Sequence, residues 1–203
     1  MNKNIDNISE KDANKKDASL KDTIIKEIFY YVKMIAIVLI ASYVLKNKII
    51  VNACIPTGSM ESTIHVQDRV FGSRIAYMNK ELERGDIVMF YAPDLTDGTI
   101  YIKRLIGLPG EKVTIKDSKI YINDSTEPLK EDYLNEAWYV KNDGYEFTVP
   151  ENAYFFLGDN RNSSFDARYW TNTYVYRDAI LAKAECIYYP FNNIKFLNDY
   201  KYE

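Results

Sequence analysis

The hydrophobic positions of the chain fall into one long block and many short ones. The long block covers residues 28–45 and contains a single charge, Lys33, near its first end. A helix of this length spans roughly 27 Å at about 1.5 Å per residue, which is enough to cross the hydrocarbon core of a bilayer. Lys33 can extend its amine to the headgroups, and Tyr30, Tyr31 and Tyr43 suit the interfaces. The block predicts a transmembrane anchor over residues 24–47.

The residues that flank this block decide between an anchor and other kinds of helix. Residues 1–23 are rich in Asn, Asp and Lys, so we expect a disordered tail. A cleaved secretory signal would need a small-residue cleavage site. Cleavage near Ala53 would sever a predicted strand, which favours a permanent anchor. A buried helix of a soluble domain remains the alternative, and the flanking lysines favour a cytoplasmic N-terminus only slightly.

After the long block, apolar residues come in short runs bounded by Gly, Pro, Asn and Asp. Such runs predict short strands joined by turns. They favour a mostly β fold, an antiparallel sheet or partly closed barrel over residues 48–203, with a small β insertion at roughly 111–152. Residues 124–146 are polar and predict a loop, and residues 177–180 predict one helical turn. The expected strands are 49–55, 70–75, 86–91, 100–107, 112–116, 119–123, 151–157 and 181–188.

Composition narrows the classes of function. The 203 residues suffice for one domain and an anchor, and a net charge of −3 offers no basic surface for nucleic acid. Cys54 and Cys186 lack metal-type spacing, and no phosphate-binding glycine motif is present. We therefore expect no metal and no cofactor. A disulfide stays open, although buried free cysteines are the commoner arrangement.

The candidate chemistry begins with Ser59 and Lys103. A serine hydroxyl is a poor nucleophile until a base removes its proton. The single histidine, His65, lies so close to Ser59 in the chain that no distant imidazole completes a Ser-His-Asp triad. A lysine serves as the base when burial lowers its pKa, and Lys103 lies in an apolar run. Taken singly, each residue is more commonly a turn serine or a solvated lysine; together they predict a Ser/Lys dyad.

Four sequence blocks follow the anchor in a fixed order. They are residues 55–64, 84–90, 101–111 and 158–170. In this order the blocks resemble those of bacterial type I signal peptidases, membrane-tethered serine proteases that remove signal peptides from exported proteins. The resemblance covers the anchor and nearly all of residues 49–190. The single anchor and short intervening domain are similar to the Gram-positive subfamily.

The resemblance implies roles for individual residues. Ser59 would be the nucleophile and Lys103 the general base, with the Ser59 N–H and the Thr57 hydroxyl as oxyanion donors. Ser164 would position the lysine amine. Because Lys103 and Arg104 are adjacent in a strand, their side chains point to opposite faces. The pairs expected behind the dyad are Asp159 with Arg104 and Asp166 with Arg168, with ordinary surface ion pairs as the alternative. The expected walls of a pocket for a small substrate side chain are Ile55, Met60, Ile64 and Ile102.

Three positions depart from the family pattern. Ser62 stands where the family usually has Pro, Ala167 where Ser is common, and Glu111 where Asp is usual. None of them is a candidate catalytic group. Without the proline we expect a looser turn after Ser59.

The function that follows is an endopeptidase of the cell membrane, with its catalytic domain on the extracytoplasmic side. Its partners would be the lipid bilayer and the signal peptides of preproteins, cut after an Ala-x-Ala-like site. The substrate would add as a strand between residues 53–56 and 100–103. One alternative is a self-cleaving Ser/Lys regulator, which the membrane-like segment argues against. Another is a non-catalytic factor in pilus or surface-protein assembly, which would need neither Ser59 nor Lys103.

Overall fold

The structure is a computed structural model that describes residues 3–139, 142–197, 200 and 202. The chain divides into two compact units, Met1–Lys46 and Asn47–Glu203. Each unit is described by itself.

The first unit consists of helix α1 (Lys3–Val44), which is followed by a short π-helix (Leu45–Ile49). Residues 23–49 are long and apolar enough to cross a membrane, and a stretch of 18 residues within them has a mean hydropathy of 2.1. The expected disordered tail of residues 1–23 differs from the structure, because α1 begins at Lys3. This stretch is polar but contains no Gly or Pro, so no residue in it breaks the helix.

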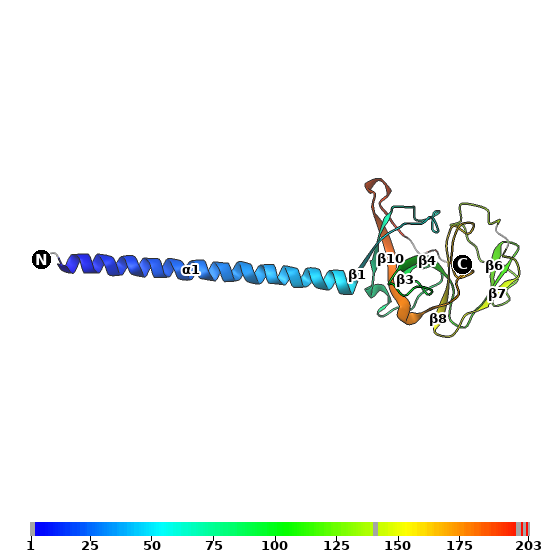
Figure 1. The fold of residues 1–203 in the computed structure, drawn as a ribbon, viewed down its shortest axis with the longest axis horizontal. Helices are drawn as coiled ribbons and strands as arrows, with labels where there is room; N and C mark the ends of the chain where they lie inside the picture. Colours follow the sequence, from blue (N-terminus) through cyan, green and yellow to red (C-terminus); the bar gives the residue numbers. More distant parts are fainter. Residues whose placement is uncertain (1–2, 140–141, 198–199, 201, 203) are drawn as a thin grey trace. The chain divides into compact units, whose positions relative to one another are not determined.

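The second unit is built on an antiparallel sheet with the strand order β1-β2-β10-β3-β4-β8-β9, and β11 pairs with β10 (Figure 1). The mostly β fold expected from the sequence is confirmed. Single turns of 3-10 helix lie at Ile75–Tyr77, Arg177–Ala179 and Phe191–Asn193, the second of which was expected. The strands are β1 (Ile50–Cys54), β2 (Arg69–Ser73), β3 (Ile87–Tyr91), β4 (Ile100–Gly107), β8 (Ala153–Leu157), β9 (Val175–Tyr176), β10 (Ile180–Tyr189) and β11 (Lys195–Phe196).

A small second sheet occupies the place of the predicted insertion. Its order is β6 (Lys119–Ile122), β5 (Lys112–Lys116) and β7 (Tyr145–Thr148). Asp117 and Ser118 form the expected tight turn between β5 and β6, with φ angles of 50° and 56°, the left-handed values that a type I′ hairpin turn requires. Strand β7 was expected to be mostly loop. It is short and half polar, so its pairing with β5 decides its conformation.

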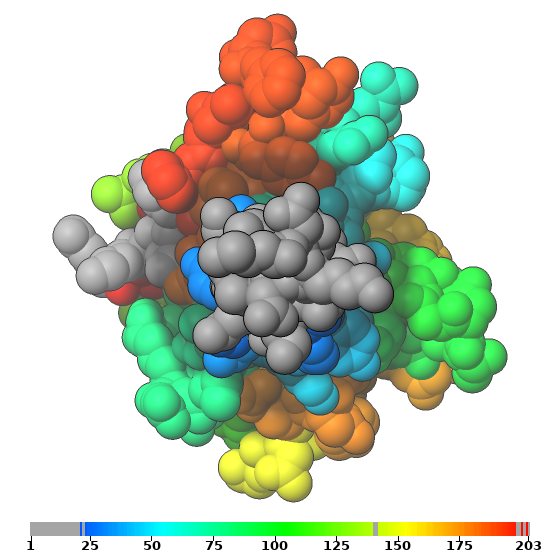
Figure 2. Space-filling view, turned by 90° about the vertical axis from the view of Figure 1, so that its left-hand side faces the viewer, coloured from blue at the N-terminus to red at the C-terminus, as the bar shows by residue number. Residues whose placement is uncertain are grey.

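Buried apolar side chains form two clusters that meet at the central strands. One cluster contains Phe90, Leu105 and Phe155 and reaches into the small sheet; the other contains Met60, Ile64 and Met89. Adjacent residues of β3 therefore face different surroundings, with Phe90 in the first cluster and Met89 in the second. The tip of the β10–β11 hairpin, which includes the exposed Phe191, projects at the top of the view in Figure 2.

Candidate active site

Ser59 and Lys103 meet in the second unit. Ser59 lies in the turn that follows β1, and Lys103 lies in β4. The Lys103 Nζ is 2.6 Å from the Ser59 Oγ and also donates to the Ile102 carbonyl at 3.3 Å. Ser59 is 8% exposed and Lys103 is 5% exposed. The two groups are within the reach that proton transfer needs.

The setting of Lys103 changes its acid–base behaviour. Burial lowers the pKa of the amine from 10.5 to about 8, while the charges of Asp166 and Asp159 oppose part of this shift. Burial dominates because it disfavours the charged ammonium. The Tyr101 ring, whose centroid lies 5.5 Å from Nζ, covers one side of the amine. A substantial fraction of Lys103 is therefore neutral near pH 8.

The turn that contains Ser59 is held by backbone hydrogen bonds and by Asn160. The Ile64 N–H donates to the Met60 carbonyl at 2.7 Å, which folds the chain back after Ser59. The Asn160 N–H donates to the Ser59 carbonyl and its Nδ2 to the Gly58 carbonyl, both at 3.1 Å. Sequence reasoning missed Asn160, although its place in the block of residues 158–170 was a signal.

Thr57 lies beside Ser59, where the expected oxyanion donors should meet. Its Oγ1 is 3.5 Å from the Ser59 Oγ. A hydroxyl at this distance can turn toward a carbonyl oxygen attacked by Ser59.

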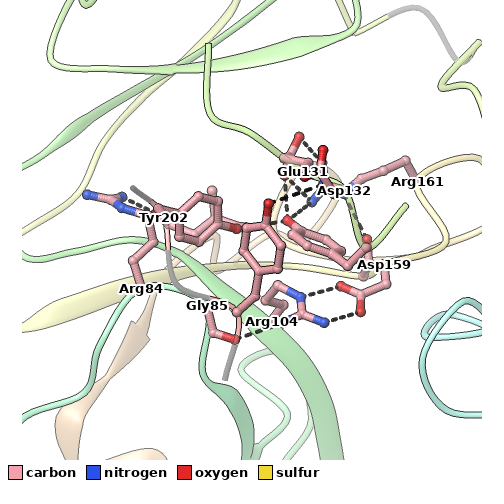
Figure 3. Close-up of polar contacts among 12 residues, drawn as sticks. Arg84, Gly85, Arg104, Glu131, Asp132, Asp159, Arg161 and Tyr202 are labelled. Carbon is pink, nitrogen blue, oxygen red and sulfur yellow. Dashed lines mark hydrogen bonds and ion pairs between the residues drawn. The ribbon is translucent and has the colours of Figure 1, made fainter. Parts of the chain in front are cut away.

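Arg104 and Asp159 form a buried ion pair on the opposite side of β4 (Figure 3). The Arg104 Nε and Nη2 donate to the two Asp159 oxygens at 2.8 and 2.6 Å, and Nη1 donates to the Gly85 carbonyl at 2.8 Å. Their side chains are 2% and 0% exposed. The Thr63 hydroxyl donates to Asp159 at 2.5 Å. The surface-pair alternative is therefore wrong here, and the carboxylate links β4 to the chain after Ser59.

Asp166 and Arg168 form the second expected pair. The Arg168 Nε and Nη2 donate to Asp166 at 2.8 and 2.9 Å, and the Gly158 N–H donates to the same carboxylate at 3.0 Å. Arg168 also donates to the Arg161 carbonyl at 3.0 Å. These contacts close residues 158–168 into a compact loop against the dyad strand.

Ser164 differs from its expected role. Its hydroxyl is buried and has no hydrogen-bond partner among the residues that the structure describes, whereas a bond to Lys103 was expected. The lysine amine is directed to Ser59 and the Ile102 carbonyl instead. Ser164 still lies next to the site, because a Cβ at Gly158 would collide with the Ser164 hydroxyl and the Ser59 carbonyl. Gly158 lets the two loops approach this closely.

A cavity of about 240 Å³ opens at the dyad. Three of the expected wall residues, Ile55, Met60 and Ile102, line it. Ile64 does not: it is fully buried in the core behind Met60. Cys54 was expected to be buried, yet it is an exposed free thiol on the cavity wall, and Cys186 is also free. The wall residues that sequence reasoning missed include Tyr101, Ser163 and Phe165.

Comparison with known proteins identifies the family. The family described as "Signal peptidase, peptidase S26" matches residues 28–189. The chain belongs to this family. The activity that follows is the cleavage of signal peptides by a serine endopeptidase. Together with the apolar span of α1, membership indicates anchoring in a membrane.

Individual relatives and a solved structure are similar to the chain. The chain is 32% identical to "Signal peptidase I S" of Bacillus subtilis over 83% of its own length and 92% of that protein. It is 34% identical to "Probable signal peptidase I-2" of Synechocystis sp. over 71% of the chain and 66% of that protein. A crystal structure of a signal peptidase I from Enterococcus faecalis is 36% identical, with a TM-score of 0.41 over 51% of this chain and 97% of that one.

The positions that depart from the usual signal peptidase pattern all have contacts. Glu111 binds Arg84 through both carboxylate oxygens, at 2.8 and 2.5 Å. Ala167 is fully buried in the core. Ser62 lies against Asn135, whose N–H donates to its hydroxyl at 3.4 Å. The loop between β6 and β7 thus supports the turn that lacks the proline.

Other candidate groups lie outside the dyad. The His65 Nδ1 is 2.9 Å from the exposed Glu61 carboxylate, and half of each side chain is exposed. Among the described residues, no group of three or more His, Cys, Asp or Glu is placed to hold a metal ion.

Proposed function

We propose that Ser59 and Lys103 carry out the peptide hydrolysis. The neutral Lys103 amine accepts the Ser59 proton while Oγ attacks the scissile carbonyl carbon. The tetrahedral intermediate collapses, Lys103 returns the proton to the leaving amine, and an acyl-Ser59 ester remains. Lys103 then takes a proton from water as the water oxygen attacks the ester. The bond between the acyl carbon and Oγ breaks, Lys103 returns the proton to Ser59 Oγ, and the signal peptide leaves with its new carboxylate. The observation that carries this proposal is the 2.6 Å separation of Nζ and Oγ in a buried setting.

The oxyanion of the intermediate would be held by the Ser59 N–H and the Thr57 hydroxyl. The 3.5 Å separation of the Thr57 and Ser59 hydroxyl oxygens supports this role. Removing one such donor typically lowers turnover by about 10²–10³-fold.

The substrate would be an extended segment that ends in small residues, such as an Ala-x-Ala-like site. Two strand edges without a partner strand among the described residues support this geometry. One is the outer edge of β1, which is at the end of the sheet. The other is the edge of β4 at residues 100–103, because β8 pairs with β4 only from Arg104 onward. The cavity is lined from both sides, by residues 53–57 and residues 99–103. A segment between them would gain main-chain hydrogen bonds, and the apolar walls would select small side chains.

The catalytic unit would lie on the extracytoplasmic side of the cell membrane, with the N-terminus in the cytoplasm. The lysines that flank α1 support this orientation only slightly. The stronger support is the activity, since a signal peptide is removed from a preprotein that has already crossed the membrane.

Incubation with a signal-peptide substrate in detergent tests the roles of the dyad. Ser59→Ala and Lys103→Ala should each abolish cleavage while the thermal unfolding transition stays cooperative, because the two groups act as a unit. Normal turnover by a folded Lys103→Ala protein would contradict the proposed role of Lys103 as the general base. The non-catalytic alternative predicts instead that the wild type itself leaves the substrate uncut.

A further inference from the structure

Three tyrosines cover the ion pair behind the dyad strand. Tyr133, Tyr200 and Tyr202, hereafter the tyrosine lid, join the loop between β6 and β7 to the last described residues. The ring centroids of Tyr133 and Tyr200 are 4.9 Å apart, and those of Tyr200 and Tyr202 are 5.0 Å apart. The hydroxyls of Tyr133 and Tyr202 are 2.9 Å apart. The lid is one connected aromatic cluster.

The lid covers the face of the Arg104 guanidinium that its ion pair leaves open. The Arg104 Cζ lies 4.0 Å from the centroid of the Tyr133 ring. The edge of the guanidinium binds Asp159 and the Gly85 carbonyl, and Tyr202 lies near Gly85 (Figure 3). The Tyr200 carbonyl passes so close to Gly85 that a Cβ there would collide with it. Water is therefore excluded from both the edge and the covered face of Arg104.

The same lid holds a second buried ion pair. The Tyr133 hydroxyl donates to Glu131 at 2.6 Å and accepts from the Arg161 Nη2 at 3.0 Å. Arg161 binds the two Glu131 oxygens at 2.7 and 3.0 Å, and its Nε donates to the Gly158 carbonyl at 2.9 Å. Both ion pairs thus fix the short turn of residues 158–161, one through Asp159 and the other through Arg161 and the Gly158 carbonyl. Burial raises the pKa of the Tyr133 and Tyr202 hydroxyls, so both keep their protons at neutral pH.

This turn joins the two members of the dyad. Asp159 binds Arg104, which is next to Lys103 in β4. Asn160, which follows Asp159 in the chain, donates to the Ser59 carbonyl. We propose that the tyrosine lid is a positioning element for the reaction, which keeps water out of the two ion pairs and so holds Ser59 and Lys103 in register. This proposal rests on the proposed roles of Ser59 and Lys103.

The proposal predicts a dependence on salt that a simple loss of packing would not produce. Raising NaCl from about 0.1 to about 1 M shortens the Debye length from about 10 to about 3 Å, which screens solvated ion pairs far more than buried ones. The wild-type kcat at saturating substrate should therefore change less than about twofold over this range. In Tyr202→Leu, water reaches the pairs. We expect a kcat about tenfold lower at low salt, which corresponds to about 1.4 kcal/mol, with a further fall of threefold or more at high salt and a KM within about twofold.

Two matched variants sharpen the test. Tyr202→Phe keeps the ring, so its kcat should stay within about threefold of wild type and remain insensitive to salt. Tyr139→Leu makes the same chemical change in the loop that contains Tyr133, at a ring that is 73% exposed, and should behave as wild type. Thermal unfolding checks that each variant is folded. If Tyr202→Leu does not fold, the same kinetic measurements are made on Tyr200→Leu.

The outcomes separate this proposal from the dyad mechanism. A folded Tyr202→Leu protein with wild-type kcat overturns the lid's positioning role. A lower kcat without salt dependence also overturns it, because that result marks a loss of packing alone. Cleavage by Ser59→Ala, assayed in parallel, would instead overturn the proposed dyad, whatever the lid variants do.

Discussion

Lys103 shows how one residue combines a cost in stability with a gain in reactivity. Its amine is buried beside Ser59, and burial lowers its pKa to about 8. The same burial lowers the free energy of unfolding at neutral pH, because the charged amine is more stable in water than in the protein interior. Two predictions follow from this conflict, one for turnover and one for stability.

Turnover should rise with pH as Lys103 loses its proton, with an apparent pKa near 8. Ser164→Asp should shift this rise to higher pH, because an anion near the amine stabilises the ammonium and silences the base at pH 7. Ser164→Ala should leave kcat, KM and stability close to wild type, since the structure gives this buried hydroxyl no described partner to lose. Measuring kcat against pH for the three proteins tests this. Wild-type activity of Ser164→Asp at pH 7 would contradict the neutral-lysine mechanism.

Stability should increase when the buried amine is removed. The fall in the pKa of Lys103 from 10.5 to about 8 corresponds to about 3 kcal/mol, at about 1.4 kcal/mol per tenfold change. Below pH 8 both the folded and unfolded states hold the proton, so this penalty is fully present. It fades between about pH 8 and 10.5, where only the unfolded state stays protonated. Lys103→Met should therefore unfold at higher temperature than wild type at pH 7, with a smaller advantage at pH 10. Lys116→Met, at an exposed lysine of β5, is the control and should show no such pH-dependent gain.

At the scale of elements, the loop that follows β8 is fixed by buried ion pairs. Residues 158–168 lie in the chain between β8 and β9, and no regular secondary structure stiffens them. Asp159, Asp166 and their arginines supply that stiffness. Asp159 ties the loop to Thr63 and Arg104, and Asp166 closes the loop on itself through Gly158 and Arg168.

Removing one partner of such a pair should cost more than removing an exposed charge. Asp159→Ala leaves the Arg104 guanidinium buried and unpaired, so we expect a loss of about 3–5 kcal/mol in unfolding free energy and a lower kcat. Asp132→Ala is the matched control. Asp132 pairs with Lys130 at 3.3 Å with both side chains about two-thirds exposed, and its loss should cost less than about 1 kcal/mol. Urea unfolding of the two variants compares them; equal losses would show that burial of the Arg104 pair contributes nothing special.

At the scale of the whole molecule, the chain combines an apolar helix with a β catalytic unit. The apolar span is long enough to cross a bilayer and carries few charges. The full chain should therefore sediment with membranes and resist carbonate extraction, because the span is stable only in hydrocarbon. A protein that begins at Lys46 should stay in the supernatant. Quantitative release of the full chain by carbonate would argue against the anchor.

Much of the fold was predictable because its signals are local. Apolar runs with turn residues between them gave most strands, and the eighteen-residue apolar block gave the long helix. Strand β7 was missed because its four residues lack a strong pattern and depend on β5. The predicted disordered tail also differs, since a polar segment without Gly or Pro can continue a helix that already exists.

The features of the site also divide into those that local sequence predicts and those that tertiary packing decides. The sequence by itself singled out Ser59 and Lys103 as the candidate pair and determined that Lys103 and Arg104 face opposite ways, because residue chemistry and strand alternation are local properties. Only the tertiary structure decided that Ile64 lies behind the cavity wall, that Asn160 holds the Ser59 carbonyl and that three tyrosines cover Arg104. These contacts join segments far apart in the chain. Their geometry depends on how the two sheets and the loops pack, which no local pattern of residues encodes.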